Sequence, residues 1–224
     1  MTNWLMEQQL VISLLLLTLI TLEAKAMKSL GANVIYALWL LVPLLLITNN
    51  LPQDVIRVDD KSIYRYIVEI GGKSNTVHIS FNWALVWLSG CLGILALGAF
   101  AQWKIYRLAH FESNSIKLNV ALPKSLKVVS NKQLSSPILS GILKPTLLVP
   151  VGFQSQFSAR QQHLMIRHEL VHFHRGDNLY NLLALIFLAV FWFNPLSWMA
   201  YRAFRRSQEI ACDAAVLKQS TTED

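Results

Sequence analysis

The stretch LYNLLALIFLAVFWFNPLSWMAY, Leu179 to Tyr201, is apolar over nearly all of its length and is interrupted by Asn194-Pro195. An unbroken helix of this length would cross a bilayer, whose hydrocarbon core is about 30 Å thick. Proline breaks a helix and disfavours helix at the residue before it, so a helix from Leu179 to Phe193 would be only about 22 Å long. The stretch therefore predicts either a fourth membrane span or a helical hairpin, and the residues on its two sides decide between them.

The segment before this stretch, RHELVHFHRGD, holds His168, Glu169 and His172 in the order H-E-x-x-H. Two histidines four residues apart lie on one face of a helix, where two imidazoles can bind one metal ion. The glutamate between them is placed to take a proton from the attacking water. Ser158 is a candidate N-cap for this helix. We predict a metal site with Glu169 as the catalytic base; the alternative is a helix whose histidines bind nothing.

The segment after the stretch, RRSQEIACDAAVL, supplies Glu209 and Asp213, again four residues apart on a helix. A catalytic zinc usually takes three protein ligands, and we predict Glu209 as the third. Asp213 would accept a hydrogen bond from a ligand imidazole and fix its tautomer. Alternatively, the pair lies on a solvated helix face, with Arg205 as the ion-pair partner of Glu209. Ligands at about 2 Å from one ion cannot lie on opposite sides of a bilayer, so we predict a membrane-associated hairpin at residues 179–208.

Other candidate ligands carry weaker patterns. Cys212 could be a soft ligand, although a small packed residue is the simpler interpretation. Asp177 either hydrogen-bonds a ligand histidine or merely follows the helix end at Gly176, and the sequence leaves both open. The remaining histidines lie off the face of the motif or in loop and juxtamembrane positions; they are His78, His110, His163 and His174.

Three further apolar runs are long enough to span a bilayer as helices of about 20 residues. They are Trp4 to Leu22, Leu30 to Thr48 and Phe81 to Phe100. Pro43 predicts a kink in the second run. The first run could be a secretory signal peptide, but such a peptide has positive residues before its apolar core, and this N-terminus has Glu7. We expect a three-helix transmembrane region over residues 1–101, with a loop at about 49–80.

The charges orient these helices. The 224-residue chain is 54% hydrophobic and 15% charged, with a net charge of +7 and a mean hydropathy of +0.40. A basic chain could bind nucleic acid, but the apolar runs require a bilayer, and positive residues favour its cytoplasmic side. They occur in the first loop, at Lys25 and Lys28, and after the third run. We expect an external N-terminus and 49–80 loop, a cytoplasmic region from about Gln102, and no direct nucleic-acid binding.

Residues 102–224 form the second predicted domain. Four short apolar or alternating runs precede the metal motif and predict a small sheet; they are IKLNVAL, LKVVS, ILSGIL and TLLVP. An exposed edge of this sheet could align an extended peptide by strand addition, or the sheet could serve only to pack on the helix. The expected fold is mostly α, with polytopic membrane helices and a small cytoplasmic α+β zinc-binding domain.

Three segments together carry a resemblance. They are SPILSGILKPTLLVP at 136–150, HELVHFHRGDNLYNLL at 168–183 and FWFNPLSWMAYRAFRRSQEIACDAAVL at 191–217. In combination they resemble the bacterial antirepressor metallopeptidases, membrane-anchored proteases related to the β-lactam sensor-transducers. The resemblance covers about Pro137 to Leu217 and implies a gluzincin-type zinc endopeptidase. It assigns Zn²⁺ binding to His168, His172 and Glu209, and catalysis to Glu169.

The resemblance also implies a biological role. Relatives act on cytoplasmic transcriptional repressors or cleave themselves after an external signal, so we expect regulatory proteolysis at the bacterial inner membrane. We expect a member without the C-terminal sensor domain, because only residues 214–224 follow Asp213. The alternatives are a quality-control protease and a non-enzymatic signalling scaffold whose structural zinc is closed by Cys212. The expected partners are the bilayer and a protein substrate. The sequence does not decide whether the chain forms a homo-oligomer.

Overall fold

The computed structural model describes the whole chain except residues 1, 51–81, 111–112, 116–117, 119–121 and 221–224. The predicted loop at 49–80 and the first predicted strand, in the run IKLNVAL, lie almost wholly outside the described residues. The helices are α1 (Thr2–Leu30), α2 (Ala32–Leu38), α3 (Leu41–Asn49), α5 (Trp83–His110), α6 (Phe153–Gln156), α7 (Ala159–Arg175), α8 (Asp177–Val190) and α9 (Pro195–Ser220). The strands are β1 (Ser113–Ser115), β2 (Lys127–Asn131), β3 (Ile138–Ser140) and β4 (Thr146–Pro150).

Among the described residues, three helical segments are long and apolar enough to cross a membrane, which confirms the three predicted runs. They are Met6–Leu30, Ala32–Asn49 and Trp83–Ala109. The prediction of a loop at Lys25 and Lys28 is wrong, because α1 continues through both lysines to Leu30. The residues Glu, Ala, Lys and Met of this segment all favour helix, so nothing local ends it. The chain instead turns at Gly31, whose φ of 83° favours glycine.

The second apolar segment breaks between α2 and α3, close to the predicted kink at Pro43. Proline lacks an amide N–H and clashes with the carbonyl four residues earlier, which here belongs to Trp39. The backbone accordingly changes to tighter hydrogen bonds, from Leu40 N–H to Ala37 O at 3.0 Å and from Val42 N–H to Trp39 O at 3.2 Å. Pro43 then lies in the first turn of α3.

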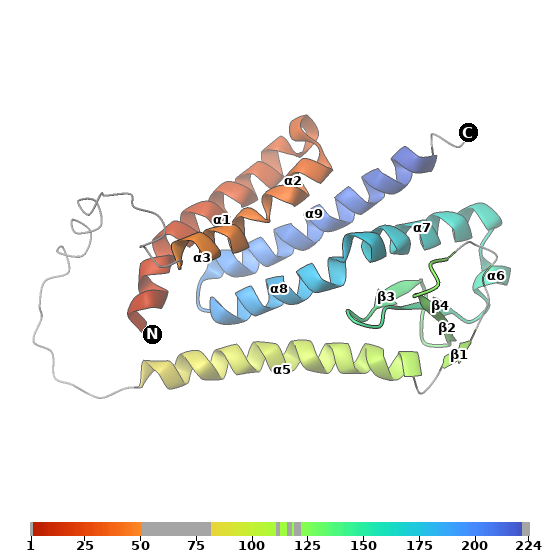
Figure 1. Cartoon of the computed structure of the whole chain (residues 1–224), viewed down its shortest axis with the longest axis horizontal. Helices are drawn as coiled ribbons and strands as arrows, with labels where there is room; N and C mark the ends of the chain where they lie inside the picture. Colours follow the sequence, from red (N-terminus) through yellow and green to blue (C-terminus); the bar gives the residue numbers. More distant parts are fainter. Residues whose placement is uncertain (1, 51–81, 111–112, 116–117, 119–121, 221–224) are drawn as a thin grey trace, which may run out of the picture.

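The helices α8 and α9 run antiparallel and are joined by residues 191–194 (Figure 1). Pro195 is the first residue of α9, and the Asn194 side chain accepts a hydrogen bond from the Leu196 N–H at 2.9 Å, so this pair starts the helix. The same side chain donates to Gln9 and Ser13 of α1, at 2.9 Å each. The chain therefore turns back after α8, as a hairpin requires, and its placement in the membrane stays a prediction.

Helices α1, α2 and α3 lie on one side of α9, and α5 lies beside α8 on the other (Figure 1). Ile12, Leu16, Trp39 and Phe204 belong to the buried core on the α1 side. The buried Glu23 of α1 pairs with the Arg206 guanidinium of α9 through two hydrogen bonds of 2.7 and 2.8 Å. Together these contacts fix α9 against the apolar helices.

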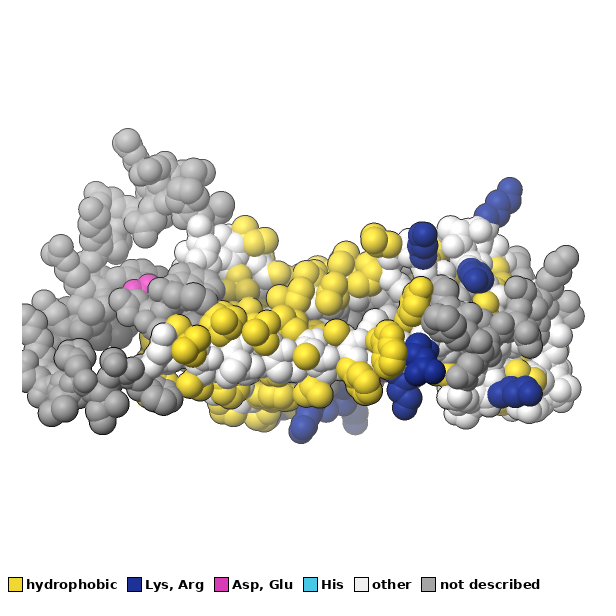
Figure 2. All heavy atoms as spheres, turned by 90° about the horizontal axis from the view of Figure 1, so that it is seen from below, with side chains coloured by type: hydrophobic (Ala, Val, Ile, Leu, Met, Phe, Trp, Pro, Cys, Tyr) yellow, Lys and Arg dark blue, Asp and Glu magenta, His cyan; other side chains and the backbone are white. Residues whose placement is uncertain are grey.

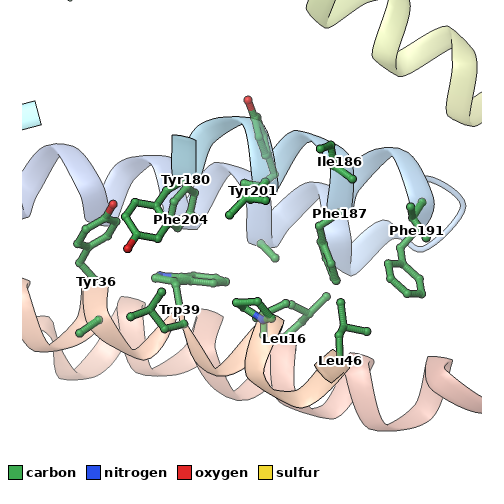
Figure 3. Close-up of a pocket in the computed structure, with 18 of the residues that line it drawn as sticks. Leu16, Tyr36, Trp39, Leu46, Tyr180, Ile186, Phe187, Phe191, Tyr201 and Phe204 are labelled. Carbon is green, nitrogen blue, oxygen red and sulfur yellow. The ribbon is translucent and has the colours of Figure 1, made fainter. Parts of the chain in front are cut away.

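An apolar cavity of about 650 Å³ lies between the α1–α3 group and the α8–α9 pair (Figure 3). Aromatic rings from both sides line it, including those of Tyr36, Trp39, Phe187 and Phe204. On the outer surface, Figure 2 shows hydrophobic side chains along the helical part, with Lys and Arg gathered toward the end that carries the sheet. This arrangement matches a membrane protein whose basic residues lie beside the bilayer.

The sheet has the strand order β1-β2-β4-β3, and β3 pairs antiparallel with β4 in the register Leu139 to Leu147. The second predicted run thus overlaps β2, and the third and fourth contain β3 and β4. All five residues of β4 are buried. Leu147, Val149 and Phe153 pack with Ile166 of α7 in a second core. This core holds α7 against the sheet and leaves the short strand β3 at the edge.

Candidate metal centre

Helix α7 presents both histidines of the motif on one face. Its N-terminus is closed by a capping box, in which Ser158 accepts from the Gln161 N–H and Gln161 accepts from the Ser158 N–H; this confirms the predicted cap. The Nε2 atoms of His168 and His172 lie 3.1 Å apart. The two imidazoles therefore converge on one point beside the helix.

The carboxylate of Glu209 reaches the same point from α9. Its Oε2 atom lies 3.5 Å from Nε2 of His168 and 3.5 Å from Nε2 of His172. The three predicted ligands thus form a nearly equilateral triangle of donor atoms. This long-range arrangement depends on the return of α9 alongside α8 and α7.

The donor triangle fits a zinc ion. Donors at about 2.0–2.1 Å from a tetrahedral metal lie about 3.3 Å from one another, and the triangle has sides of 3.1, 3.5 and 3.5 Å. Two imidazoles and one carboxylate are also a donor set found in catalytic zinc sites, which keep one position open. His168, His172 and Glu209 would hold the ion.

Glu169 and the donor triangle line the same small cleft. The cleft has a volume of about 170 Å³. The backbone N–H of Leu139, in β3, donates a hydrogen bond of 2.7 Å to Glu169 Oε2. Burial raises the pKa of the Glu169 carboxyl, although the hydrogen bond from Leu139 opposes the shift. A carboxylate with a raised pKa is a better proton acceptor near neutral pH, as a general base requires.

Each histidine has a carboxylate on its outer ring nitrogen. Asp213 Oδ1 lies 3.1 Å from His168 Nδ1, where the sequence predicts it, and Asp177 Oδ2 lies 2.6 Å from His172 Nδ1. Asp177 also begins α8, but its contact with His172 favours the first of the two interpretations left open for it, a hydrogen bond with a ligand histidine. Asp177 is buried, whereas the Asp213 side chain is 67% exposed. These contacts orient Nε2 of both rings toward the donor triangle.

Cys212 is also close to the two histidines. Its sulfur and one ring nitrogen of each histidine lie within 4.8 Å of one another, and its side chain is fully buried. Burial would raise the pKa of this thiol, but the neighbouring His168 and His172 lower it overall. The thiol donates a hydrogen bond of 3.3 Å to the backbone carbonyl of His168, which supports the prediction of a packed residue. The structure nonetheless brings a fourth potential donor to the site.

The charges around the triangle favour a cation. The contacts of His168 with Cys212 and then Glu209 raise its pKa to about 10. Burial works against protonation of His172, but hydrogen bonds with Asp177, Cys212 and Glu209 prevail and raise its pKa to about 11. The two histidines in turn lower the pKa of the Glu209 carboxyl. A metal ion would replace the protons that these side chains otherwise share.

The structure adds residues that the sequence analysis did not assign to the site. Asn178, Asn181 and Arg205 line the cleft, together with Ile138 and Leu139 of β3. The spacing of Arg205, four residues before Glu209, predicts only an ion pair between them and not a place in the cleft. The buried Oδ1 of Asn181 has no hydrogen-bond partner among the described residues, so it could accept from a bound peptide.

The remaining histidines stay apart from the cluster or cannot be placed. His174 is exposed, and its Nδ1 lies 2.7 Å from the carbonyl of Leu170. His163 is not among the residues that line the cleft. His78 and the side chain of His110 lie outside the described parts of the chain.

Comparison with known proteins gives one family. The profile described as BlaR1 peptidase M56 matches residues 3–223. The chain is 28% identical over 171 residues to the regulatory protein BlaR1 of Bacillus licheniformis. This match covers 65% of the chain and 26% of the relative. The chain is 24% identical over 153 residues to the methicillin resistance mecR1 proteins of Staphylococcus aureus and Staphylococcus epidermidis, covering 64% of the chain and 26% of each relative. The chain thus matches about a quarter of the length of these curated relatives.

Proposed function

The chain belongs to the BlaR1 peptidase M56 family, and we propose that it is a membrane-bound zinc endopeptidase with His168, His172 and Glu209 as metal ligands. The observation that carries the proposal is the triangle of donor atoms at 3.1, 3.5 and 3.5 Å. It combines two helices that are distant in sequence, and a catalytic carboxylate lies beside it in the same cleft.

Bound zinc would act as a Lewis acid toward a peptide carbonyl and make water a stronger nucleophile. Glu169 accepts the proton from the attacking water and then delivers a proton to the leaving nitrogen. Asp213 and Asp177 hold the two ligand imidazoles in the tautomer that keeps Nε2 free of hydrogen. Arg205 lines the cleft and supplies positive charge near the carbonyl oxygen.

The edge strand β3 supports an extended peptide as substrate. Ile138 and Ser140 lie on either side of Leu139, whose N–H points away from β4 to Glu169. Backbone groups of this edge lie directly beside the catalytic carboxylate. A peptide that added to the edge as a further strand would bring its own backbone to the donor triangle.

We further propose that the site faces the cytoplasm and that the protease acts in regulatory proteolysis. The positive end of the described surface and the names of the relatives, a regulatory protein and resistance proteins, support this role. A cytoplasmic transcriptional repressor, or the chain itself, would be the substrate. A quality-control protease of the same membrane would use the same chemistry on other proteins.

The second candidate function is a non-enzymatic scaffold with a structural zinc. Structural zinc sites are closed by four protein ligands. The proximity of Cys212 to both histidines is the observation that favours this alternative. Glu169 would then have no role in proton transfer.

The Glu169→Gln variant separates the two functions. The wild type and the Glu169→Gln variant would be purified in detergent, loaded with zinc, and incubated with an unfolded protein such as casein. We expect equal zinc content and a loss of cleavage by about 10²–10⁴-fold, because the amide cannot accept the proton. His174→Gln, on the same helix but away from the cluster, should leave zinc and activity unchanged. Full proteolysis by Glu169→Gln would refute the catalytic assignment.

The natural substrate can be found with the same variant. Cells that carry wild type or Glu169→Gln would be compared for new protein N-termini and for proteins that accumulate uncut. A repressor among the uncut proteins supports regulatory proteolysis, whereas misfolded membrane proteins among them support quality control.

A further inference from the structure

Tyr36 of the apolar helix α2 contacts the hydrogen-bonded surroundings of the metal centre. Its hydroxyl donates to Asp177 Oδ1 at 2.8 Å. It also accepts from Gln208 Nε2 at 3.1 Å. Both partners are buried, each with about 1% of its surface exposed. One hydroxyl from a candidate membrane span therefore serves two buried polar groups beside the site.

These two partners lead to different metal ligands. Asp177 holds His172 Nδ1 through its other oxygen, at 2.6 Å. Gln208 precedes Glu209 in α9, and its Oε1 accepts from Arg205 Nη1 at 3.2 Å. Arg205 in turn lies 3.9 Å from Glu209 Oε1. The Tyr36 hydroxyl thus connects Asp177, which contacts His172, with Gln208, which contacts the Arg205 partner of Glu209.

The ring of Tyr36 is held by two neighbouring side chains. It stacks on Phe204 of α9 with 5.7 Å between ring centroids, and the Arg175 guanidinium lies 4.2 Å from its centroid. Arg175 Nε also lies 3.3 Å from the Asp177 oxygen that the hydroxyl contacts. Tyr36 also lines the apolar cavity between the α1–α3 group and the α8–α9 pair (Figure 3). The position of the hydroxyl therefore follows the position of α2 against α9.

We propose that Tyr36 is a positioning residue through which α2 controls the orientation of His172, and hence the affinity of the centre for its metal. In the arrangement seen here, Asp177 is held by Tyr36 and directs the lone pair of His172 Nε2 toward the donor triangle. A movement of α2 relative to α9 would withdraw the hydroxyl, leave Asp177 Oδ1 with Arg175 as its remaining partner, and loosen His172. The inference rests on the proposed metal centre and adds a route from the membrane helices to it.

Zinc affinity, measured by competition with a chelator on purified full-length protein, tests the proposal. Tyr36→Phe removes only the hydroxyl. The loss of a partner that orients a metal ligand costs about 10–100-fold in affinity, and Tyr36 acts one contact further away, so we expect about three- to tenfold weaker binding. Tyr201→Phe removes a hydroxyl from another part of the same cavity lining and should leave the affinity unchanged.

A double-mutant cycle separates positioning from general destabilisation. If Tyr36 acts through Asp177, Tyr36→Phe added to Asp177→Ala, which removes the acceptor of the hydroxyl, causes no further loss of zinc affinity. An additive loss, or an affinity of Tyr36→Phe equal to that of wild type, overturns the proposal. Gln208→Met removes the other hydrogen bond to the hydroxyl and should weaken zinc binding in the same direction, which gives a second variant if Tyr36→Phe does not fold.

The result also distinguishes this proposal from the function on which it rests. If wild type binds no zinc, both are wrong. If wild type binds zinc and cleaves protein while Tyr36→Phe matches it in zinc affinity, only the role of Tyr36 is wrong.

Discussion

The Oε2 atom of Glu209 lies 3.5 Å from Nε2 of His172, although all of α8 and the first half of α9 separate the two residues in the sequence. The contact exists because α8 ends at Val190 and α9 returns beside it. A helix of 14 residues is about 21 Å long, shorter than a hydrocarbon core of about 30 Å. The proposed metal centre and the proposed membrane topology therefore depend on one another.

This coupling predicts that α7 and the end of α9 lie on the same side of the membrane. Single cysteines at Leu143 and Lys218, in a background without Cys91 and Cys212, should both react with a membrane-impermeant thiol reagent only from the cytoplasmic side. Both positions are exposed. A cysteine at Ser158 would instead remove the N-cap of α7. A cysteine at Asn82, before α5, should react from outside.

Labelling of Lys218 from outside with Leu143 labelled from inside would show that residues 179–201 cross the bilayer. Glu209 could not then bind the same ion as His172 within one subunit. A reaction of Asn82 from the cytoplasm would instead reverse the proposed orientation of α5.

Glu209 is the proposed third ligand and Cys212 a candidate fourth, and paired variants distinguish an open site from a closed one. We expect Cys212→Ser to keep stoichiometric zinc and nearly full activity, because its sulfur is engaged by the His168 carbonyl and three other donors suffice. Glu209→Gln should weaken zinc binding by more than about 100-fold, since loss of an outer partner alone costs about 10–100-fold. Zinc content per protein measures both. Loss of zinc from Cys212→Ser would favour a closed, structural site.

The two outer aspartates should differ in their effect on zinc affinity. Asp177 is 1% exposed and contacts His172 at 2.6 Å, whereas Asp213 is 67% exposed and contacts His168 at 3.1 Å. Water replaces an exposed partner more easily than a buried one. We expect Asp177→Asn to weaken zinc binding by about 10–100-fold and Asp213→Asn by only a few-fold. Chelator competition gives both values, and the reverse order would contradict the structure.

The metal-free protein should lose stability as the pH rises above neutral. The folded-state pKa values of His168 and His172, about 10 and about 11, lie above the ordinary value of 6.5. A raised pKa contributes stability that is complete below about pH 6.5 and is lost as the pH rises through the folded value. We expect the thermal unfolding midpoint of chelator-treated protein to decrease as the pH is raised from 7 to 9.5.

The His168→Ala variant is the control for this pH dependence. It lacks one of the two titrating groups, so its midpoint should fall less over the same range. A midpoint of the wild type that is constant or rises from pH 7 to pH 9.5 would contradict the raised pKa values. Zinc-loaded protein should show a weaker dependence, because the ion replaces the protons.

Much of the architecture is determined by local patterns in the sequence. Apolar runs of sufficient length predict the three candidate spans, and the period of the helix places His168 and His172 on one face. Ser158 caps α7 through a residue three positions away, and Pro43 breaks the helix at the carbonyl four positions before it. These features involve neighbours within about one helical turn, so composition and spacing suffice to predict them.

Only the tertiary structure decided the remaining contacts. Spacing could propose Glu209 but could not fix its distance to His172, because that distance depends on the turn at Asn194 and on the packing of α9 against α1. The charge pattern predicts a loop at Lys25 and Lys28, whereas α1 continues through both residues because the segment favours helix, and only the structure shows that Glu23 in this segment pairs with Arg206 of α9. Tyr36 carried no recognisable pattern at all. A tyrosine in an apolar run is ordinary, and it reaches Asp177 only because α2 and α8 both pack against α9, which brings side chains from distant segments within hydrogen-bond distance.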